Sequence, residues 1–179
     1  MSLFAPMKRL LIVYHSRTGF AKQMATHLAL GAESASKEME TPLNITTRRA
    51  AEATVSDLLA ADGYLFAAPE NLASVSGEML EFFHRSYYDV FDDSERSLLL
   101  GRPVGIAVAG GSDGRMAARQ MERIATGWRL KSVREPLVLR NGLVQTKRNV
   151  LLPKVMDEKQ ERECWELGGL VAATLLLED

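Results

Sequence analysis

The chain has 179 residues, a formal net charge of −1, 46% hydrophobic residues and 25% charged residues, which is the composition of an ordinary globular protein. Charges this close to balance argue against a protein that holds nucleic acid, which is usually basic, and against an acidic electron shuttle steered by its charge. No apolar run reaches the roughly 18 residues needed to span a bilayer, so we expect no membrane partner.

Strands and helices are predicted in alternation along the chain. Residues 10–14 form a continuous apolar run, typical of a strand buried on both faces. A polar turn follows at 15–19, and then Ala21, Met24 and Leu28 recur at helical spacing. The same patterns predict further strands at 43–48, 63–68, 103–109 and 133–140, and further helices at 54–61, 76–85, 116–125 and 158–177.

Two prolines and one turn signal refine these boundaries. We expect the third strand to stop at Pro69, because proline has no N–H to donate to a sheet. For the same reason, Pro136 places the fifth strand at a sheet edge. Residues 141–154 begin with the turn signal Asn141-Gly142 and are predicted to form a loop or a small hairpin.

Five strands alternating with five helices predict an α/β fold, in which helices cover both faces of a parallel sheet. No stretch rich in Pro, Gly or Ser divides the chain, so we expect a single domain over residues 1–179. The apolar segment at 7–14 is too short for a signal peptide, and the single cysteine, Cys164, cannot form an internal disulfide. These features favour a cytoplasmic protein.

Ligands of such sheets bind at the carboxyl ends of the strands. Polar loops that contain glycine follow the first, third and fourth strands, at 16–21, 69–77 and 110–114. In the first loop, Ser16, Thr18 and a glycine stand between a strand and a helix, which is how backbone N–H groups, hydroxyls and a helix N-terminus form an anion site. The alternative is that the two hydroxyls only cap the helix. The spacing matches neither a Walker A loop nor G-x-G-x-x-G.

Three motifs, in this order, resemble those of flavodoxin-like proteins of the FMN-reductase type. Residues 14–19 (YHSRTG) resemble the flavodoxin phosphate loop, [ST]-x-T-G-x-T. Residues 69–77 are similar to the second flavin loop of these proteins, and residues 109–114 (AGGSDG) to the third. The resemblance covers residues 8–139 and implies a flavodoxin-like, doubly wound, five-stranded parallel sheet with strand order 2-1-3-4-5.

The resemblance also implies a cofactor, FMN, and the residues that bind it. The FMN phosphate would be held by Ser16, Arg17, Thr18, Gly19, Phe20 and Ala21. One side of the isoalloxazine ring would be lined by Pro69, Glu70, Asn71, Leu72 and Ala73, and its pyrimidine edge approached by Gly110, Gly111, Asp113 and Gly114. No catalytic side chain and no metal site are expected, because these residues bind and orient while the flavin supplies the redox chemistry.

The implied activity is that of an NAD(P)H-dependent oxidoreductase, which passes electrons from a reduced nicotinamide through FMN to a small acceptor such as a quinone or free flavin. Two alternatives stay open: a non-enzymatic, flavodoxin-type electron carrier, and a flavodoxin-like module with weakened flavin binding. The last rests on two departures from the family pattern. Phe20-Ala21 stands where relatives carry Asn-Thr, and residues 72–74 replace aromatic or glycine residues. A homodimer is also compatible with the resemblance.

Three further features each carry two interpretations. His15 either contacts the ligand or makes a structural hydrogen bond. The arginines at 115, 119 and 123 either attract nucleotide phosphates or form a solvated helix face paired with acids such as Glu122. Tyr87-Tyr88 either packs on a dimer partner or covers the core.

Overall fold

The computed structural model describes residues 6–178, and it confirms the predicted sheet. The strands are β1 (Lys8–Tyr14), β2 (Leu43–Arg49), β3 (Gly63–Asn71), β4 (Ser74–Val75), β5 (Pro103–Gly110), β6 (Lys131–Ser132) and β7 (Leu137–Arg140). The sheet runs β2-β1-β3-β5-β6 with parallel pairing throughout, and β7 also pairs with β5 in parallel. With β6 and β7 counted as one broken strand, this is the order 2-1-3-4-5.

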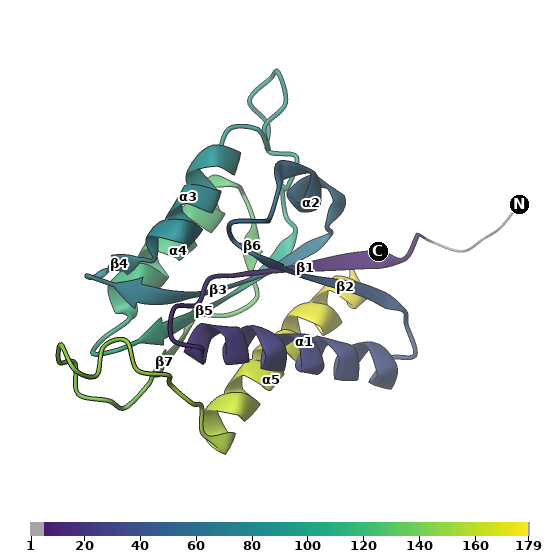
Figure 1. Cartoon of the computed structure of the whole chain (residues 1–179). Coiled ribbons are helices and arrows are strands. Elements are labelled where there is room, and N and C mark those ends of the chain that lie inside the picture. Colours follow the sequence, from purple (N-terminus) through teal and green to yellow (C-terminus); the bar gives the residue numbers. More distant parts are fainter. Residues whose placement is uncertain (1–5, 179) are drawn as a thin grey trace, which may run out of the picture.

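Helices cover both faces of the sheet (Figure 1). They are α1 (Phe20–Glu38), α2 (Val55–Ala60), α3 (Gly77–Ser86), α4 (Arg115–Gly127) and α5 (Glu158–Leu177). One apolar core joins the sheet to α1 and α5, and a second joins its other face to α2, α3 and α4. Within residues 6–178, no helix combines the length and the apolar character that a membrane crossing needs.

The helices α1 and α5 approach each other at two glycines. A Cβ atom on Gly168 would lie 1.9 Å from the carbonyl oxygen of Leu28, and a Cβ on Gly31 would lie 1.9 Å from that of Trp165. Because no side chain fits at either position, the two backbones pack in direct contact. This contact fixes the middle of α1 against α5.

Aromatic rings hold the opposite layer in place. Phe66 on β3 lies 5.4 Å from Phe83 and 6.3 Å from Phe82 of α3, measured between ring centroids. Trp128, at the end of α4, lies 5.6 Å from Phe83 in an edge-to-face arrangement, which is a favourable geometry for aromatic pairs. These contacts fix α3 and α4 relative to β3.

Three details differ from the predicted boundaries. The third strand does not stop at Pro69, because Pro69 is in register with Ala109 at the end of the parallel ladder and the chain then turns back as β4. The fifth strand is interrupted between β6 and β7, next to Pro136, although its edge position is confirmed. Residues 141–154 form a loop with a turn and no strand.

Candidate functional site

One cavity lies at the carboxyl edge of the sheet and brings together all three loops singled out in the sequence. Its volume is about 500 Å³, which is within the range of small-molecule and cofactor sites. The predicted site residues that line it are Ser16, Arg17, Thr18, Phe20, Ala21, Pro69, Glu70, Asn71, Leu72, Ala73 and Gly111. Those that do not line it are Gly19, Gly110, Asp113 and Gly114.

The first loop leaves backbone N–H groups available to a ligand. The Gly19 N–H donates to Ser16 Oγ (3.1 Å), and Gly19 has a φ of 92°, which glycine adopts without strain. Gly19 is also the N-cap residue of α1 and no side chain bonds to the first turn, so the two loop hydroxyls do not cap the helix. Among the described residues, no acceptor pairs with the N–H groups of Arg17, Thr18 or Phe20. With the positive end of α1, these groups have the chemistry that an anion would need.

The second loop is a tight hairpin between β3 and β4. Its tip residues, Leu72 and Ala73, have φ values of 52° and 58°, and the Leu72 side chain is fully exposed. The hairpin is fixed to α4 by Gln120, whose Oε1 accepts hydrogen bonds from Ser74 Oγ and the Val75 N–H, both at 2.9 Å. It therefore offers aliphatic side chains, and no aromatic ring, to a ligand in the cavity.

The third loop is held by the second one. Glu70 Oε1 accepts a hydrogen bond from the Gly114 N–H (2.9 Å), and Glu70 Oε2 accepts one from Ala117 (3.4 Å), so the carboxylate lies at the N-terminus of α4. Asp113 forms an ion pair with Arg115 at 2.6 Å instead of entering the cavity. The structure thus places Gly114 and Asp113 in supporting positions around the cavity.

Residues 141–154 supply a wall that we did not predict. The cavity-lining residues outside the predicted set are Ala109, Ser112, Asn141, Gln145, Val150, Leu151 and Lys154. The wall starts at Asn141, whose N–H donates to the Gly110 carbonyl (3.1 Å), which gives Gly110 a supporting role. The turn signal at the end of the fifth strand was the one sequence feature that pointed to this edge.

Lys154 is the buried polar residue of this wall, with only 6% of its surface exposed. Its ammonium donates to the carbonyls of Asn149 (3.4 Å), Val150 (2.8 Å) and Leu152 (3.1 Å). Burial lowers the pKa of Lys154, because a charged group loses hydration there. The three carbonyls compensate for part of that loss and hold the turn at 149–152.

His15 makes a structural hydrogen bond outside the cavity. Its Nδ1 lies 2.8 Å from Ser76 Oγ, and its Nε2 lies 3.7 Å from Glu78 Oε2. Burial lowers the pKa of His15; the Glu78 carboxylate opposes this, while Arg49 and Arg17 reinforce it. Among residues 6–178, no group of three or more His, Cys, Asp or Glu side chains could hold a metal ion.

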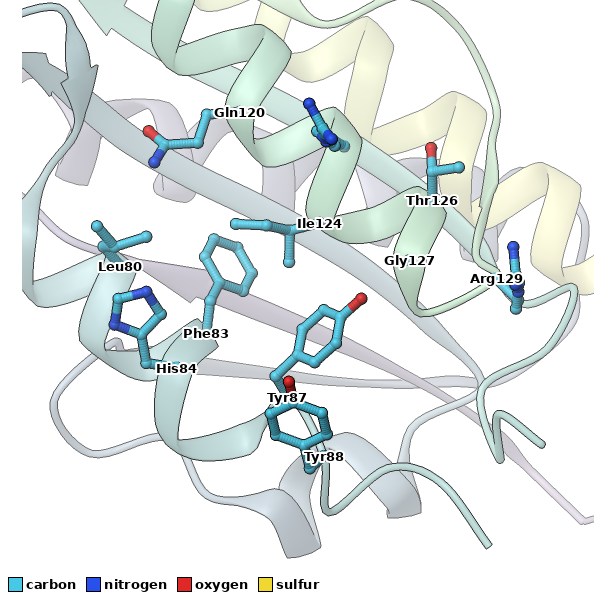
Figure 2. A pocket seen from close by; sticks show the side chains of 11 residues that line it. Leu80, Phe83, His84, Tyr87, Tyr88, Gln120, Ile124, Thr126, Gly127 and Arg129 are labelled. Atoms are coloured by element: carbon cyan, nitrogen blue, oxygen red, sulfur yellow. The ribbon is translucent and has the colours of Figure 1, made fainter. Parts of the chain in front are cut away.

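A larger hollow, of about 790 Å³, lies between α3 and α4. Figure 2 shows its apolar wall, with Leu80, Phe83 and Ile124 near its centre and Tyr87 and Tyr88 at one end. The Tyr88 side chain is 81% exposed. None of the predicted site residues lines this groove.

The comparisons with known proteins agree with this geometry. A family model described as NADPH-dependent FMN reductase matches residues 15–142, a range that contains all three loops. A flavodoxin from Aquifex aeolicus (strain VF5) is 36% identical over 77 residues, which is 43% of this chain and 39% of that protein. The chain thus matches well under half the length of this relative.

Solved structures show the same fold. An oxidoreductase from Corynebacterium diphtheriae superposes with a TM-score of 0.71 at 17% identity, covering 98% of this chain and 100% of that one. A flavodoxin from the domain Archaea gives 0.68 at 15% identity, covering 94% and 99%. A flavodoxin, WrbA-like protein from Agrobacterium tumefaciens gives 0.64 at 16% identity, covering 96% and 99%. At these identities the likeness establishes the flavodoxin-like fold alone.

Proposed function

Because the chain belongs to the NADPH-dependent FMN reductase family, we propose that it binds FMN at the carboxyl edge of the sheet and acts as an NAD(P)H-dependent oxidoreductase. The observation that carries this proposal is the set of free N–H groups at Arg17, Thr18 and Phe20, in one cavity with the second and third loops. We further propose a small acceptor, such as a quinone or free flavin, and a cytoplasmic location.

The cavity fits the two chemically different ends of FMN. At one end, the loop at 16–21 offers N–H donors, hydroxyls and the N-terminus of α1, which suit a phosphate. At the other, Leu72, Ala73 and Leu151 offer apolar surface to a ring system. Gly111, in the third loop, also lines the cavity.

In this proposal the chain binds and orients, while its side chains carry out no proton transfer. Arg17 and the loop N–H groups offset the phosphate charge, and the hairpin at 72–73 limits the position of the ring. Redox chemistry, which is hydride acceptance from a nicotinamide and electron release to a second substrate, is supplied by FMN when it is bound. The missing aromatic ring in the hairpin favours weaker binding than in proteins that stack the flavin.

The first experiment is a titration of the purified protein with FMN, followed by flavin fluorescence and the visible spectrum. We expect saturable binding, and bleaching of the flavin band when NADH or NADPH is added without oxygen. Absence of any binding would refute the proposal. Binding without bleaching by either nucleotide would instead favour the electron-carrier function.

Thr18→Ala tests the phosphate loop. Loss of a hydrogen bond to a charged group costs about 1.5–3 kcal/mol, so FMN affinity should fall roughly 10- to 150-fold. Riboflavin, which has no phosphate, should bind both forms equally. Thr26→Val is the matched control, because Thr26 is exposed on α1, outside the loop at 16–21, and its hydroxyl bonds to the Lys22 carbonyl. An unchanged FMN affinity in Thr18→Ala would mean that the phosphate binds elsewhere.

We also propose that the chain forms a homodimer through the groove between α3 and α4. Exposed acids, Asp89, Asp93 and Glu95, follow the end of α3, while exposed arginines, Arg119 and Arg123, lie on α4. Of these, Arg123 lines the groove, and Asp89 directly follows Tyr88, which lines it too. Opposite charges on one surface allow that surface to pair with itself across a two-fold axis. Light scattering after gel filtration should give a dimer for the wild type and a monomer for Tyr88→Glu, and a monomeric wild type would refute this.

A further inference from the structure

We propose that residues 141–156, here called the strap, form a wall that closes on the bound ligand, and that Gln23 is the positioning residue that fastens this wall to the phosphate loop. The proposal rests on the proposed function, since the ligand is taken to be FMN. It adds a fourth chain segment, outside the three flavin loops, to the binding site.

A single side-chain amide joins the strap to the first loop. Gln23 Nε2 donates to the carbonyls of Gly19 (3.0 Å) and Lys154 (2.8 Å), and Gln23 Oε1 accepts from the Met156 N–H (3.0 Å). The Lys154 N–H also donates to the Thr18 carbonyl (2.9 Å). The amide thus uses both its donor and its acceptor across two segments that are far apart in sequence.

The strap is buried only where it is fastened. Lys154 and Met156 are buried, whereas every residue from 142 to 148 is exposed. The ammonium of Lys154 turns inward to three carbonyls of the strap itself. No ion pair to Lys154 is present among the described residues, so these carbonyls are the partners that hold its side chain within the strap.

The strap also reaches the third loop and so spans the cavity. A Cβ atom on Gly111 would lie 2.6 Å from the side-chain amide of Gln145, so that amide packs directly on the glycine backbone. Between the two attachments, Val150 and Leu151 line the cavity while 45% and 63% of their surface is exposed. A ligand with a phosphate at one end and an apolar ring at the other would cover both side chains.

Ligand binding and closure of the strap are therefore linked. An opened strap removes Val150, Leu151 and the fastening of the phosphate loop, so FMN binds the closed form better than the open one. A ligand that binds one of two states stabilises that state by mass action. FMN should then suppress any event that requires the strap to open.

Limited digestion with trypsin follows this opening, because Lys147 and Arg148 lie within the strap and a protease cuts a segment that has come away from the folded chain. At an FMN concentration 100-fold above the dissociation constant, cleavage after these residues should slow by about 100-fold. Cleavage after Arg96, an exposed residue in the loop after α3, is the internal control and should not change. Mass spectrometry of the first products separates the two sites.

Gln23→Met removes the fastening and keeps the size of the side chain. Without ligand, this variant should be cut at 147–148 about tenfold faster or more, because two buried hydrogen-bonding groups lose their partner. Its FMN affinity should fall as well. Thr26→Val, on the same helix and outside the fastening, should behave like the wild type in both assays.

The possible failures are distinguishable. A wild type that binds no FMN would overturn the proposed function and this proposal together. Normal FMN binding with unchanged cleavage at 147–148 would overturn the strap alone. A Gln23→Met variant that matches Thr26→Val in cleavage and in affinity would refute the role of Gln23.

Discussion

Replacing Glu70 tests how the second and third loops are held together. Its carboxylate accepts hydrogen bonds from Gly114 (2.9 Å) and Ala117 (3.4 Å) at the N-terminus of α4. A hydrogen bond to a charged acceptor contributes about 1.5–3 kcal/mol, and a negative charge at a helix N-terminus about 0.3–1 kcal/mol. Because Glu70 is half-buried, water screens part of the charge. We expect Glu70→Ala to lower the free energy of unfolding by about 2 kcal/mol.

The assay is urea unfolding followed by circular dichroism and by fluorescence of the buried Trp128. Glu70→Gln keeps an acceptor but loses the charge, so its free energy of unfolding should fall by about half as much. Glu81→Ala is the matched control: Glu81 is an exposed acid on α3, and its removal should change stability by less than about 0.5 kcal/mol.

The result that refutes the reasoning is a Glu70→Ala variant whose free energy of unfolding lies within about 0.5 kcal/mol of the wild type. That outcome would mean that the carboxylate does not hold α4. If the loss is as expected, FMN affinity should decrease too, because the Gly111 backbone belongs to the loop that Glu70 fixes.

Three further predictions concern pH, packing and thiol chemistry. The folded-state pKa of His15 lies below the unfolded value of 6.5, so the unfolded chain binds the extra proton and the free energy of unfolding should decline as pH falls through 6.5. His15→Asn should flatten that part of the curve, and an unchanged slope would contradict this assignment. Gly168→Ala should destabilise by about 1–3 kcal/mol or more, since its Cβ would meet the Leu28 carbonyl at 1.9 Å. Gly169→Ala, with its nearest contact at 3.4 Å, should be close to neutral in the same thermal melts. Burial raises the pKa of Cys164 to about 12, so a thiol reagent at pH 8 should label the protein in urea but not in buffer, and rapid labelling of the native protein would show that this helix face opens.

The element order was predictable because it depends on local patterns. Continuous apolar runs identified the strands buried on both faces, and helical spacing identified α1 and α5, the latter to the residue. The predicted strand boundaries were wrong where pairing with a neighbouring strand sets the end of a strand. Pro69 continues β3 because it stands at the last pair with β5, where a missing donor costs little.

The candidate site likewise has one part that the sequence predicts and another that depends on tertiary contacts. The loop at 16–21 is contiguous in sequence, so its hydroxyls, its glycine and the helix behind it could be recognised together. The direction of Glu70 toward α4, and the support that Asp113 and Gly114 give from outside the cavity, depend on how two loops meet. No spacing within either loop contains that information.

The strap is the clearest example of a feature that the sequence did not predict. Residues 141–156 have neither strand nor helix periodicity, and their one amide fastening joins Gln23 to a residue 131 positions away. The amino-acid sequence by itself therefore determined the strands, the helices and the polar loop at 16–21, because each arises from interactions between near neighbours. Only the tertiary structure decided which distant segments enclose the cavity, because burial and hydrogen bonding between them exist only once the sheet has brought them together.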